Sequence, residues 1–415
     1  MKKYPGMRKL YYKLNRNSEL SQSKADDFRN SYSSITPEFT IKEFPSFIMH
    51  CDEILDKVRC ILTVSRAIDI LDRKLPHKAK QQFLRRALIE EIQQTNETEN
   101  VHSTRKEIRA SLDAINLGKR GQRFDGMIRK YQLLLSKTKI TLESCQDVRT
   151  LYDEFILDEV LKENPQNTPD GLYFRQGPVF VRNKHDIVVH EGVFPEKAVN
   201  ESMEHALSFL NDSGYDPFIR IAVFHFMFAY IHPFYDGNGR MSRFISSAKL
   251  RENDIHLLVA LRLSYVIKNN RNKYYALFRE TNDKHNYGDM TLFVIGFLDF
   301  VLEACTQVSE YLQDKNEGIE HYFDVLNQMD LSKETKDILS ILIQVSICEG
   351  ESLNITSIEH ESNISKYQIN KHMSELEPLC VVDEKGRSRL FRADLTAFDE
   401  WANQSHKQQV NHNSK

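Results

Sequence analysis

Twelve consecutive residues, His232-Pro-Phe-Tyr-Asp-Gly-Asn-Gly-Arg-Met-Ser-Arg243, place a base, a carboxylate, two glycines and two arginines next to one another. A glycine-rich turn that opens a helix presents unpaired backbone N–H groups at the positive end of the helix dipole. Arg240 and Arg243, three positions apart on that helix, can offer forked donors to phosphate oxygens. The segment therefore predicts a phosphate-binding site.

Two further side chains of this segment could take part in a reaction at phosphate. Asp236 supplies a hard oxygen ligand, and Mg²⁺ bound to nucleotide phosphates commonly takes only one or two protein carboxylates. His232 has an intrinsic pKa near neutrality, which suits removal of a proton from an attacking hydroxyl. Each residue alone also fits a helix end, an ordinary turn or a solvated face. Their combination at this spacing favours chemistry.

The same residues carry a resemblance to the Fic (Fic/Doc) family, whose signature His-Pro-Phe-x-Asp/Asn-Gly-Asn-Gly-Arg-x-x-Arg is matched at every defined position. The resemblance implies transfer of AMP from ATP to a protein hydroxyl, with release of pyrophosphate. Asn238 is expected to shape the turn and Phe234 to pack beneath it. The implied roles are general base for His232, Mg²⁺ ligand for Asp236, cradle of the α- and β-phosphates for Gly237, Asn238 and Gly239, and binding of the β- and γ-phosphates for Arg240 and Arg243.

Two neighbouring elements are expected to position these residues. The apolar run Ile221–Ile231 predicts a buried helix that stops at Pro233. Alternation over 177–182 and 187–190, around a turn at 183–186, predicts a β-hairpin. In the Fic family a hairpin here, the flap (about 173–195), binds the target backbone, and we expect its target-facing residues to be Phe180 and Val181. A purely structural hairpin is the alternative.

Tyr274 and Tyr275 follow the motif on a predicted helix, and either ring could stack on adenine. Aromatic residues at helical spacing belong more often to the core, which is the competing interpretation.

A second segment points to regulation. Thr95-Asn-Glu-Thr-Glu-Asn100 closes a predicted helix and resembles the inhibitory pattern Ser/Thr-x-x-x-Glu-Gly/Asn of regulated Fic proteins. The resemblance implies that Glu99 pairs with Arg243 and occupies the space of the γ-phosphate, so that the resting enzyme is autoinhibited. Glu99 could instead orient water and hydrolyse an AMP–protein bond. An exposed helix end capped by Asn100 is the structural alternative.

The C-terminal part predicts three helices and a hairpin, which resembles a winged helix-turn-helix. Such a domain could make the chain a nucleotide-responsive DNA-binding regulator. Neighbouring acidic residues cancel the basic charge, so an intramolecular or protein-docking scaffold is favoured over DNA. The contacts nominated for DNA are Lys366, Gln368, Lys371, Arg387, Arg389 and Arg392.

The composition is that of an ordinary globular chain. Its 415 residues carry a net charge of −3, so nothing demands a nucleic-acid or membrane partner. The six cysteines form no close-spaced pairs and predict reduced thiols. No signal peptide is recognised and no segment is expected to span a bilayer, so a cytoplasmic protein is expected.

The predicted fold class is mainly α: a Fic-type helical bundle with a β-hairpin flap, followed by a winged-helix domain. The expected partners are a target protein with an exposed Ser, Thr or Tyr hydroxyl, the chain itself as a substrate, and a second copy in a homodimer. The predicted divisions are a flexible arm over 1–40, a helical region with the inhibitory helix over 41–130, the catalytic core over 131–315, the winged-helix domain over 325–396 and a polar tail over 403–415.

Overall fold

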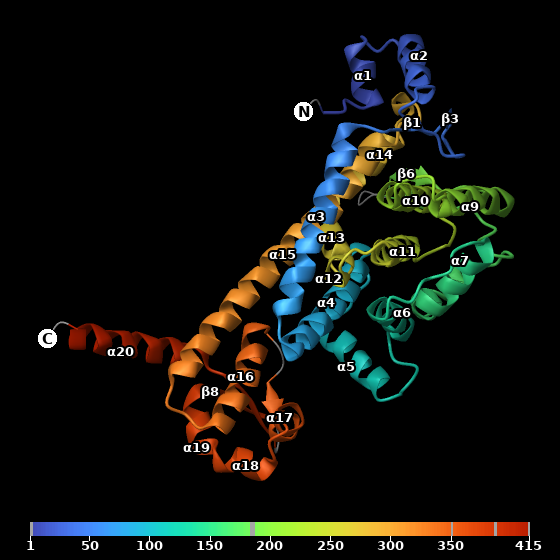
Figure 1. Cartoon of the computed structure of the whole chain (residues 1–415). Helices are drawn as coiled ribbons and strands as arrows, with labels where there is room; N and C mark the ends of the chain where they lie inside the picture. Colours follow the sequence, from blue (N-terminus) through green and yellow to red (C-terminus); the bar gives the residue numbers. More distant parts are fainter. Residues whose placement is uncertain (1–2, 183–186, 350–351, 386–387, 414–415) are drawn as a thin grey trace. The chain divides into compact units, whose positions relative to one another are not determined.

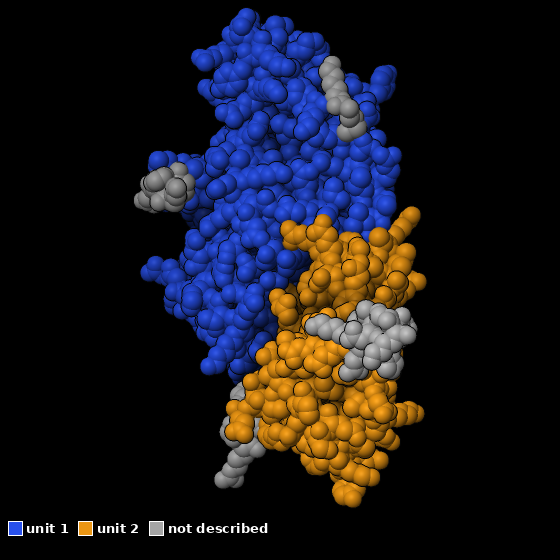
Figure 2. All heavy atoms as spheres, turned by 90° about the vertical axis from the view of Figure 1, so that its left-hand side faces the viewer, with its two compact units in different colours: residues 1–65, 88–306 blue, residues 66–87, 307–415 orange. Residues whose placement is uncertain are grey.

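The computed structural model of the chain describes residues 3–182, 187–349, 352–385 and 388–413 (Figure 1). Helices account for 67% of it, which confirms the mainly α fold class. The chain forms two compact units, one of residues 1–65 and 88–306 and the other of residues 66–87 and 307–415 (Figure 2). The division falls inside three helices, α3 (Asp52–Lys74), α4 (His77–Thr98) and α15 (Thr291–Gln328). The sequence predicted domains that follow one another along the chain, whereas each unit combines two separate stretches of it.

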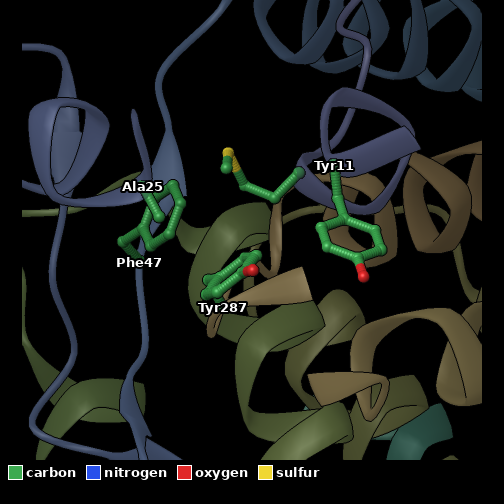
Figure 3. Packing of buried hydrophobic residues seen from close by; sticks show 5 residues of the cluster. Tyr11, Ala25, Phe47 and Tyr287 are labelled. Carbon is green, nitrogen blue, oxygen red and sulfur yellow. The ribbon is translucent and has the colours of Figure 1, made fainter. Parts of the chain in front are cut away.

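Residues 3–40 are folded, which corrects the prediction of a flexible arm. They include α1 (Met7–Lys13) and α2 (Ser18–Arg29). The Asp289 carboxylate anchors this segment because it accepts hydrogen bonds from the Tyr4 hydroxyl (2.9 Å) and the Met7 backbone N–H (3.2 Å). The anchoring partners lie far away in the sequence, so composition alone missed them. The buried cluster beneath these helices consists of Met7, Tyr11, Ala25, Phe47 and Tyr287 (Figure 3).

Short antiparallel pairs follow, β1 (Ser34–Ile35) with β4 (Ile48–Met49) and β2 (Thr40–Ile41) with β3 (Phe44–Pro45). The remaining helices before the hairpin are α5 (Arg105–Asn116), α6 (Asp125–Leu135), α7 (Cys145–Tyr152), the π-helical turn η1 (Asp153–Leu157), α8 (Asp158–Glu163) and the 3-10 turn η2 (Pro165–Asn167). Those after it are α9 (Glu196–Asn211), α10 (Pro217–Ile231), α11 (Asn238–Glu252), α12 (Leu257–Ala260), α13 (Leu263–Asn269), α14 (Arg271–Thr281) and the 3-10 turn η3 (Lys284–Asn286).

The core of the first unit is built around α10, which is apolar on all sides as the sequence predicted. It begins at Pro217, where the Asp216 side chain accepts a hydrogen bond from the Phe218 N–H (2.8 Å). It then packs against α9 and α11, and most of its residues are buried. A helix buried all round has a well-defined position. Its C-terminal end, at Ile231, therefore holds the next loop in a defined place.

The predicted hairpin is present as β5 (Phe180–Arg182) and β6 (Val188–Glu191). The strands are antiparallel, with Phe180 opposite Glu191 and Val181 opposite His190. The predicted turn at 183–186 lies outside the described residues.

The second unit contains the C-terminal helices and hairpin that the sequence predicted, and its likeness to a winged helix stays a prediction. Its antiparallel sheet has β9 (Ser388–Ala393) between β7 (Leu353–Asn354) and β8 (Cys380–Lys385). The third of the predicted helices, over 365–376, is broken near His372. Arg387 lies outside the described residues. The elements are α16 (Lys333–Ile347), β7 (Leu353–Asn354), α17 (Ile355–Ser362), α18 (Lys366–Lys371), α19 (Met373–Leu376), the 3-10 turn η4 (Glu377–Leu379), β8 (Cys380–Lys385), β9 (Ser388–Ala393) and α20 (Leu395–Asn413).

Two expectations about the C-terminal half need correction. The polar tail predicted over 403–415 is helical as far as Asn413, because α20 continues through Gln- and Asn-rich sequence that contains no Gly or Pro. Among the described residues, α15 is long and apolar enough to cross a membrane by length and composition alone. However, 67% of its apolar window is buried inside the protein, which is typical of a core helix.

Candidate active site

The loop between α10 and α11 is shaped by two residues in the left-handed region. His232 follows the last residue of α10 with φ 53° and ψ 61°, and Gly237 precedes α11 with φ 83°. The chain therefore leaves one helix and enters the next within a few residues, as Pro233 and the glycines predicted. The first N–H groups of α11 have no partners within the helix, and a helix end of this kind can bind an anion.

Asn238 and Phe234 hold this loop in shape, as predicted. The Asn238 amide accepts a hydrogen bond from the Phe234 N–H (2.9 Å) and donates one to the Phe234 carbonyl (2.8 Å). The Phe234 ring is fully buried and stacks on Tyr152, with 3.6 Å between ring centroids. The Tyr152 hydroxyl in turn donates to the Asp236 carbonyl (3.1 Å). The amide bridge and the aromatic stack make the turn rigid before any ligand arrives.

Arg240 lies at the start of α11 with a side chain that is 0% exposed. Its Nη2 lies 3.5 Å from Asp236 Oδ1. Within the part of the chain that the structure describes, its Nε and Nη1 have no hydrogen-bond acceptor. Unpaired buried donors cost free energy, and they suit an anionic ligand that brings several acceptors. This observation fits the predicted phosphate site.

Arg243 is the centre of a contact with the end of α4. Its Nη1 donates to Glu99 Oε1 (2.7 Å), its Nε to Thr95 Oγ1 (2.9 Å) and its Nη2 to the Thr95 carbonyl (2.9 Å). The Glu99–Arg243 pair that the sequence predicted is thus present. Asn100 closes the helix with φ 61°, which turns the chain away after Glu99.

Burial and charge have opposite effects on the pKa values of Glu99 and Arg243. Burial is the largest effect and disfavours the ionised forms of Glu99 and Arg243, but the attraction between the two charges, their hydrogen bond and neighbouring groups together outweigh it. The pKa of Glu99 is therefore lowered and that of Arg243 raised. Gly239 makes the approach possible, since a Cβ at this position would overlap the Glu99 carboxylate. The carboxylate consequently lies directly over the start of α11.

His232 is neutral and has one ring nitrogen engaged. Its Nδ1 lies 3.2 Å from the Ala229 carbonyl, which assigns the proton to Nδ1 and leaves the lone pair on Nε2. Burial is the main reason why the pKa of His232 falls to about 4, and the Ala229 hydrogen bond and the Glu99 charge only partly oppose it. At neutral pH the imidazole can therefore accept a proton at Nε2.

The part of the chain that carries this loop, residues 142–250, matches the Fic/DOC family. It extends from just before α7 to near the end of α11 and includes all twelve motif residues. The chain contains a Fic/DOC domain.

Three known proteins are similar to this chain in part. The probable protein adenylyltransferase aq_aa38 of Aquifex aeolicus is 40% identical over 73 residues, which are 18% of this chain and 20% of the relative. A Fic family protein from Desulfovibrio desulfuricans G20 has a TM-score of 0.50 at 19% identity, over 86% of this chain and 98% of its own. A Fic domain containing signaling protein from Bacteroides thetaiotaomicron has a TM-score of 0.44 at 15% identity, over 62% and 97%. The curated match spans about a fifth of the relative, and the Desulfovibrio desulfuricans structure indicates the fold alone.

Asp236 is the residue of the Fic domain that could hold Mg²⁺. Its side chain is 36% exposed, and its Oδ1 accepts a hydrogen bond from the Gly237 N–H. No group of three or more His, Cys, Asp or Glu side chains that could hold a metal occurs among the described residues. A Mg²⁺ ion at Asp236 would therefore take its other ligands from phosphate and water, which matches its chemistry.

The hairpin residues predicted to face a target differ in exposure. Phe180 is 45% exposed, whereas Val181 is only partly exposed. Val188 and Val189 on the opposite strand are also exposed, so apolar side chains lie on this hairpin without a covering element. Neither strand has a further partner strand among the described residues. Their role in target binding stays a prediction.

The two predicted adenine contacts lie in different surroundings. Tyr274 is buried, and its hydroxyl hydrogen bonds to Nε2 of His225 (2.7 Å), so its surroundings are those of a core residue. Tyr275 packs edge-on against Tyr274 and has the Arg271 guanidinium over its ring. Stacking on adenine stays a prediction, and the burial of Tyr274 favours Tyr275 for it.

Three residues of the site were not predicted. Thr95 binds Arg243, Tyr152 supports the loop, and Arg175 contacts the backbone of His232. Thr95 is the first residue of the sequence pattern that led to Glu99. The sequence therefore singled out this threonine but gave no sign of its hydrogen bonds to Arg243. Tyr152 and Arg175 lie in other segments and act on backbone atoms, which leaves no signature in residue spacing.

Proposed function

We propose that the protein is an adenylyltransferase that transfers AMP from ATP to a hydroxyl of a target protein. The observation that carries this proposal is the buried Arg240 side chain with two unpaired donors at the start of α11. It lies on the same short loop and helix as His232, whose Nε2 is free to accept a proton. A phosphate-binding end beside a base supports attack by a hydroxyl on a phosphate.

The proposed reaction uses these residues in the following way. His232 Nε2 takes the proton of the target hydroxyl, whose oxygen forms a bond to the α-phosphorus of ATP. The bond between that phosphorus and the oxygen bridging the α- and β-phosphates breaks, and pyrophosphate leaves with the electron pair. Arg240 and the first N–H groups of α11 stabilise the charge that develops on the phosphates. A Mg²⁺ ion held by Asp236 would supply further charge neutralisation there.

We also infer that Glu99 restrains this reaction. Arg243 points all three donor nitrogens at α4, so it cannot bind a γ-phosphate in the same geometry. Binding ATP productively requires this buried ion pair to be broken, which reduces the fraction of competent enzyme. Glu99 could alternatively hold a water that hydrolyses an AMP–protein bond, since 28% of its side chain is exposed.

The target is proposed to dock on the hairpin β5–β6, whose exposed strands and apolar side chains suit an extended peptide.

A cytoplasmic location is proposed because all six cysteines are free thiols. Self-modification, a homodimer and the lack of a membrane partner stay part of the proposal.

A protein-docking role is favoured over DNA binding for the second unit. Two of the basic residues nominated for DNA are already in ion pairs, Arg389 with Glu377 (2.7 Å) and Lys366 with Glu359 (3.6 Å). A DNA backbone would have to displace these carboxylates.

The deciding experiment incubates wild type, Glu99→Gly and Glu99→Gly/His232→Ala with Mg²⁺ and α-labelled ATP, and follows label on protein. Label that is strong in Glu99→Gly and absent in the double variant would establish the transferase, its base and its inhibitor. Glu97→Gly is the matched control, because Glu97 lies at the same helix end but pairs with Lys268 instead of Arg243. Competition with unlabelled GTP or UTP tests the preference for ATP.

The alternatives give different outcomes. A hydrolase would remove label from a modified protein in wild type and lose this activity in Glu99→Gly. A DNA-binding regulator would tolerate His232→Ala and show salt-sensitive DNA binding that Lys366→Glu abolishes. Equal labelling by Glu99→Gly and Glu97→Gly would contradict a specific role for Glu99.

A further inference from the structure

Arg175 is a fully buried arginine whose partners are backbone carbonyls. Its side chain is 0% exposed, and among the described residues no carboxylate pairs with it. Burial of a cation without a counter-charge is costly, and it lowers the pKa of this guanidinium. Its hydrogen bonds must offset this cost, and a fully bonded buried side chain holds a defined arrangement of the chain.

The first set of contacts joins Arg175 to the backbone that carries the proposed base. Its Nε donates to the His232 carbonyl (2.8 Å) and its Nη2 to the Ile231 carbonyl (3.4 Å). Its own backbone N–H donates to the Pro233 carbonyl (3.2 Å). These three consecutive carbonyls end α10 and begin the loop. A cation is favourable at this negative end of the helix.

The second set joins the same side chain to the hairpin. Its Nη1 donates to the Gly177 carbonyl (2.6 Å), just before β5. Its Nη2 also donates to the Val193 carbonyl (2.8 Å), just after β6. The two ends of the hairpin are therefore tied to one guanidinium, and that guanidinium is tied to His232.

Gly192 shows how closely these parts are packed. A Cβ at this position would lie 2.6 Å from Arg175 Nη2 and 3.0 Å from the Cβ of His232. The backbone leaving the hairpin thus passes against both residues, and only glycine allows this approach without displacement.

We propose that Arg175 is a positioning residue that fixes the hairpin relative to His232, so that a hydroxyl bound on the hairpin meets the imidazole. The inference rests on the proposed function, because it assigns target binding to the hairpin and proton transfer to His232. Lysine would keep the charge but not the planar fork that reaches carbonyls on both sides. A displacement of about 1 Å at a reacting group can cost about a hundredfold in rate.

The test compares Arg175→Met and Arg175→Lys in the Glu99→Gly background. We expect kcat for AMP transfer to fall about a hundredfold in Arg175→Met and about tenfold in Arg175→Lys. The dissociation constant of a non-hydrolysable ATP analogue should change by less than about threefold, because Arg240, Arg243 and the start of α11 are untouched. Arg220→Met is the matched control, since Arg220 also donates to a backbone carbonyl, that of Leu210 (2.7 Å), and should leave kcat unchanged.

Hydrogen exchange on the same proteins gives a readout that does not require transferase activity. Arg175→Met should speed exchange of the Gly192 and Val193 amides, which bind Val179 O and Ile231 O, while α11 stays protected. If Glu99→Gly transfers no AMP, the proposed function fails and exchange alone decides on Arg175. An unchanged kcat, unchanged exchange, or equal loss of analogue binding and kcat would overturn the positioning role. If Arg175→Met does not fold, Arg175→Lys is held to the same criteria.

Discussion

The Glu99 carboxylate accepts a hydrogen bond of 2.7 Å from Nη1 of Arg243, a residue 144 positions away in the sequence. The contact joins the end of α4 to the first turns of α11, over the N–H groups that would bind phosphate. It is a charge-assisted bond in a largely buried place, where such bonds are stronger than at the surface. The consequences are open to measurement.

Removing only the charge of Glu99 should release part of the inhibition. In Glu99→Gln the side chain keeps its size, but its hydrogen bond to Arg243 is no longer charge-assisted and weakens by about 1–2 kcal/mol. AMP transfer should rise by roughly tenfold over wild type and stay below that of Glu99→Gly. Initial rates at saturating ATP, with Glu97→Gln as control, measure this. An unchanged rate would indicate that Glu99 blocks by its volume and not by its charge.

Thr95 should act together with Glu99, because it binds the same guanidinium. Thr95→Val keeps the shape but removes the acceptor of the 2.9 Å bond from Arg243 Nε. The loss leaves a buried donor unpaired, so α4 should hold Arg243 less firmly by about 1–2 kcal/mol. Basal transfer should therefore rise severalfold.

Thr98→Val is the control for this change. Thr98 is also buried on α4, but its hydroxyl donates to the Gln94 carbonyl (2.8 Å) and not to Arg243. Equal rates in the two valine variants would show that general loosening of the helix, and not the Arg243 contact, causes the increase.

Glu91 should stabilise α4 against the core in a pH-dependent way. Its carboxylate is fully buried and accepts hydrogen bonds from the Ser264 N–H (3.1 Å), the Ser264 hydroxyl and the Tyr131 hydroxyl (3.1 Å). Burial raises the pKa of Glu91 from 4.5 to about 7, although these bonds oppose the shift. The native state therefore binds more protons than the unfolded state between these pH values.

It follows that the contribution of Glu91 to stability is full below pH 4.5 and is lost as pH rises through about 7. Relative to Glu91→Gln, wild type should lose up to about 3 kcal/mol of unfolding free energy across this window. Chemical denaturation of both proteins at several pH values measures the difference. A course for Glu91→Gln that runs parallel to that of wild type would refute the assignment.

The loop of the active site was predictable because its determinants are local. One helix ends and the next begins here because of three local features: the apolar run that precedes His232, the proline at 233 and the two glycines. None of them depends on contacts with distant parts of the chain. The Glu99–Arg243 pair has no such local cause, and only the resemblance of the Thr95–Asn100 segment to a known inhibitory pattern led to it. The residue types alone identified the reactive loop, whereas the contact proposed to regulate it was found only through the resemblance to a known family pattern.

Other parts of the fold could not be derived from local pattern. The N-terminal segment is polar and predicted a flexible arm, yet Tyr4 binds Asp289 across 285 positions. Arg175 acts through backbone carbonyls, which every residue possesses, so its four side-chain bonds leave no trace in the composition of its partners. Long-range contacts of this kind depend on the packed structure.

The pH dependence of transfer should report the state of His232. Burial lowers the pKa of His232 to about 4, so the imidazole is neutral over the whole physiological range and becomes protonated only in stronger acid. The groups that act on it are His190 and Arg175, which lower its pKa, and Glu99, which raises it. A base must be deprotonated, and activity is therefore lost only as pH falls through the lowered pKa.

We expect kcat/KM of Glu99→Gly to stay constant from pH 8 to about pH 5.5, with an acid limb below the ordinary histidine value of 6.5. Loss of Glu99 removes a charge that favours protonation, and this loss by itself lowers the pKa of His232 further. Binding of the ATP analogue at each pH is the control, because protonation of the nucleotide phosphates also weakens binding near pH 6. A limb at pH 6.5 with unchanged analogue binding would mean that His232 is solvated and ionises normally, and that burial does not set the state of the base.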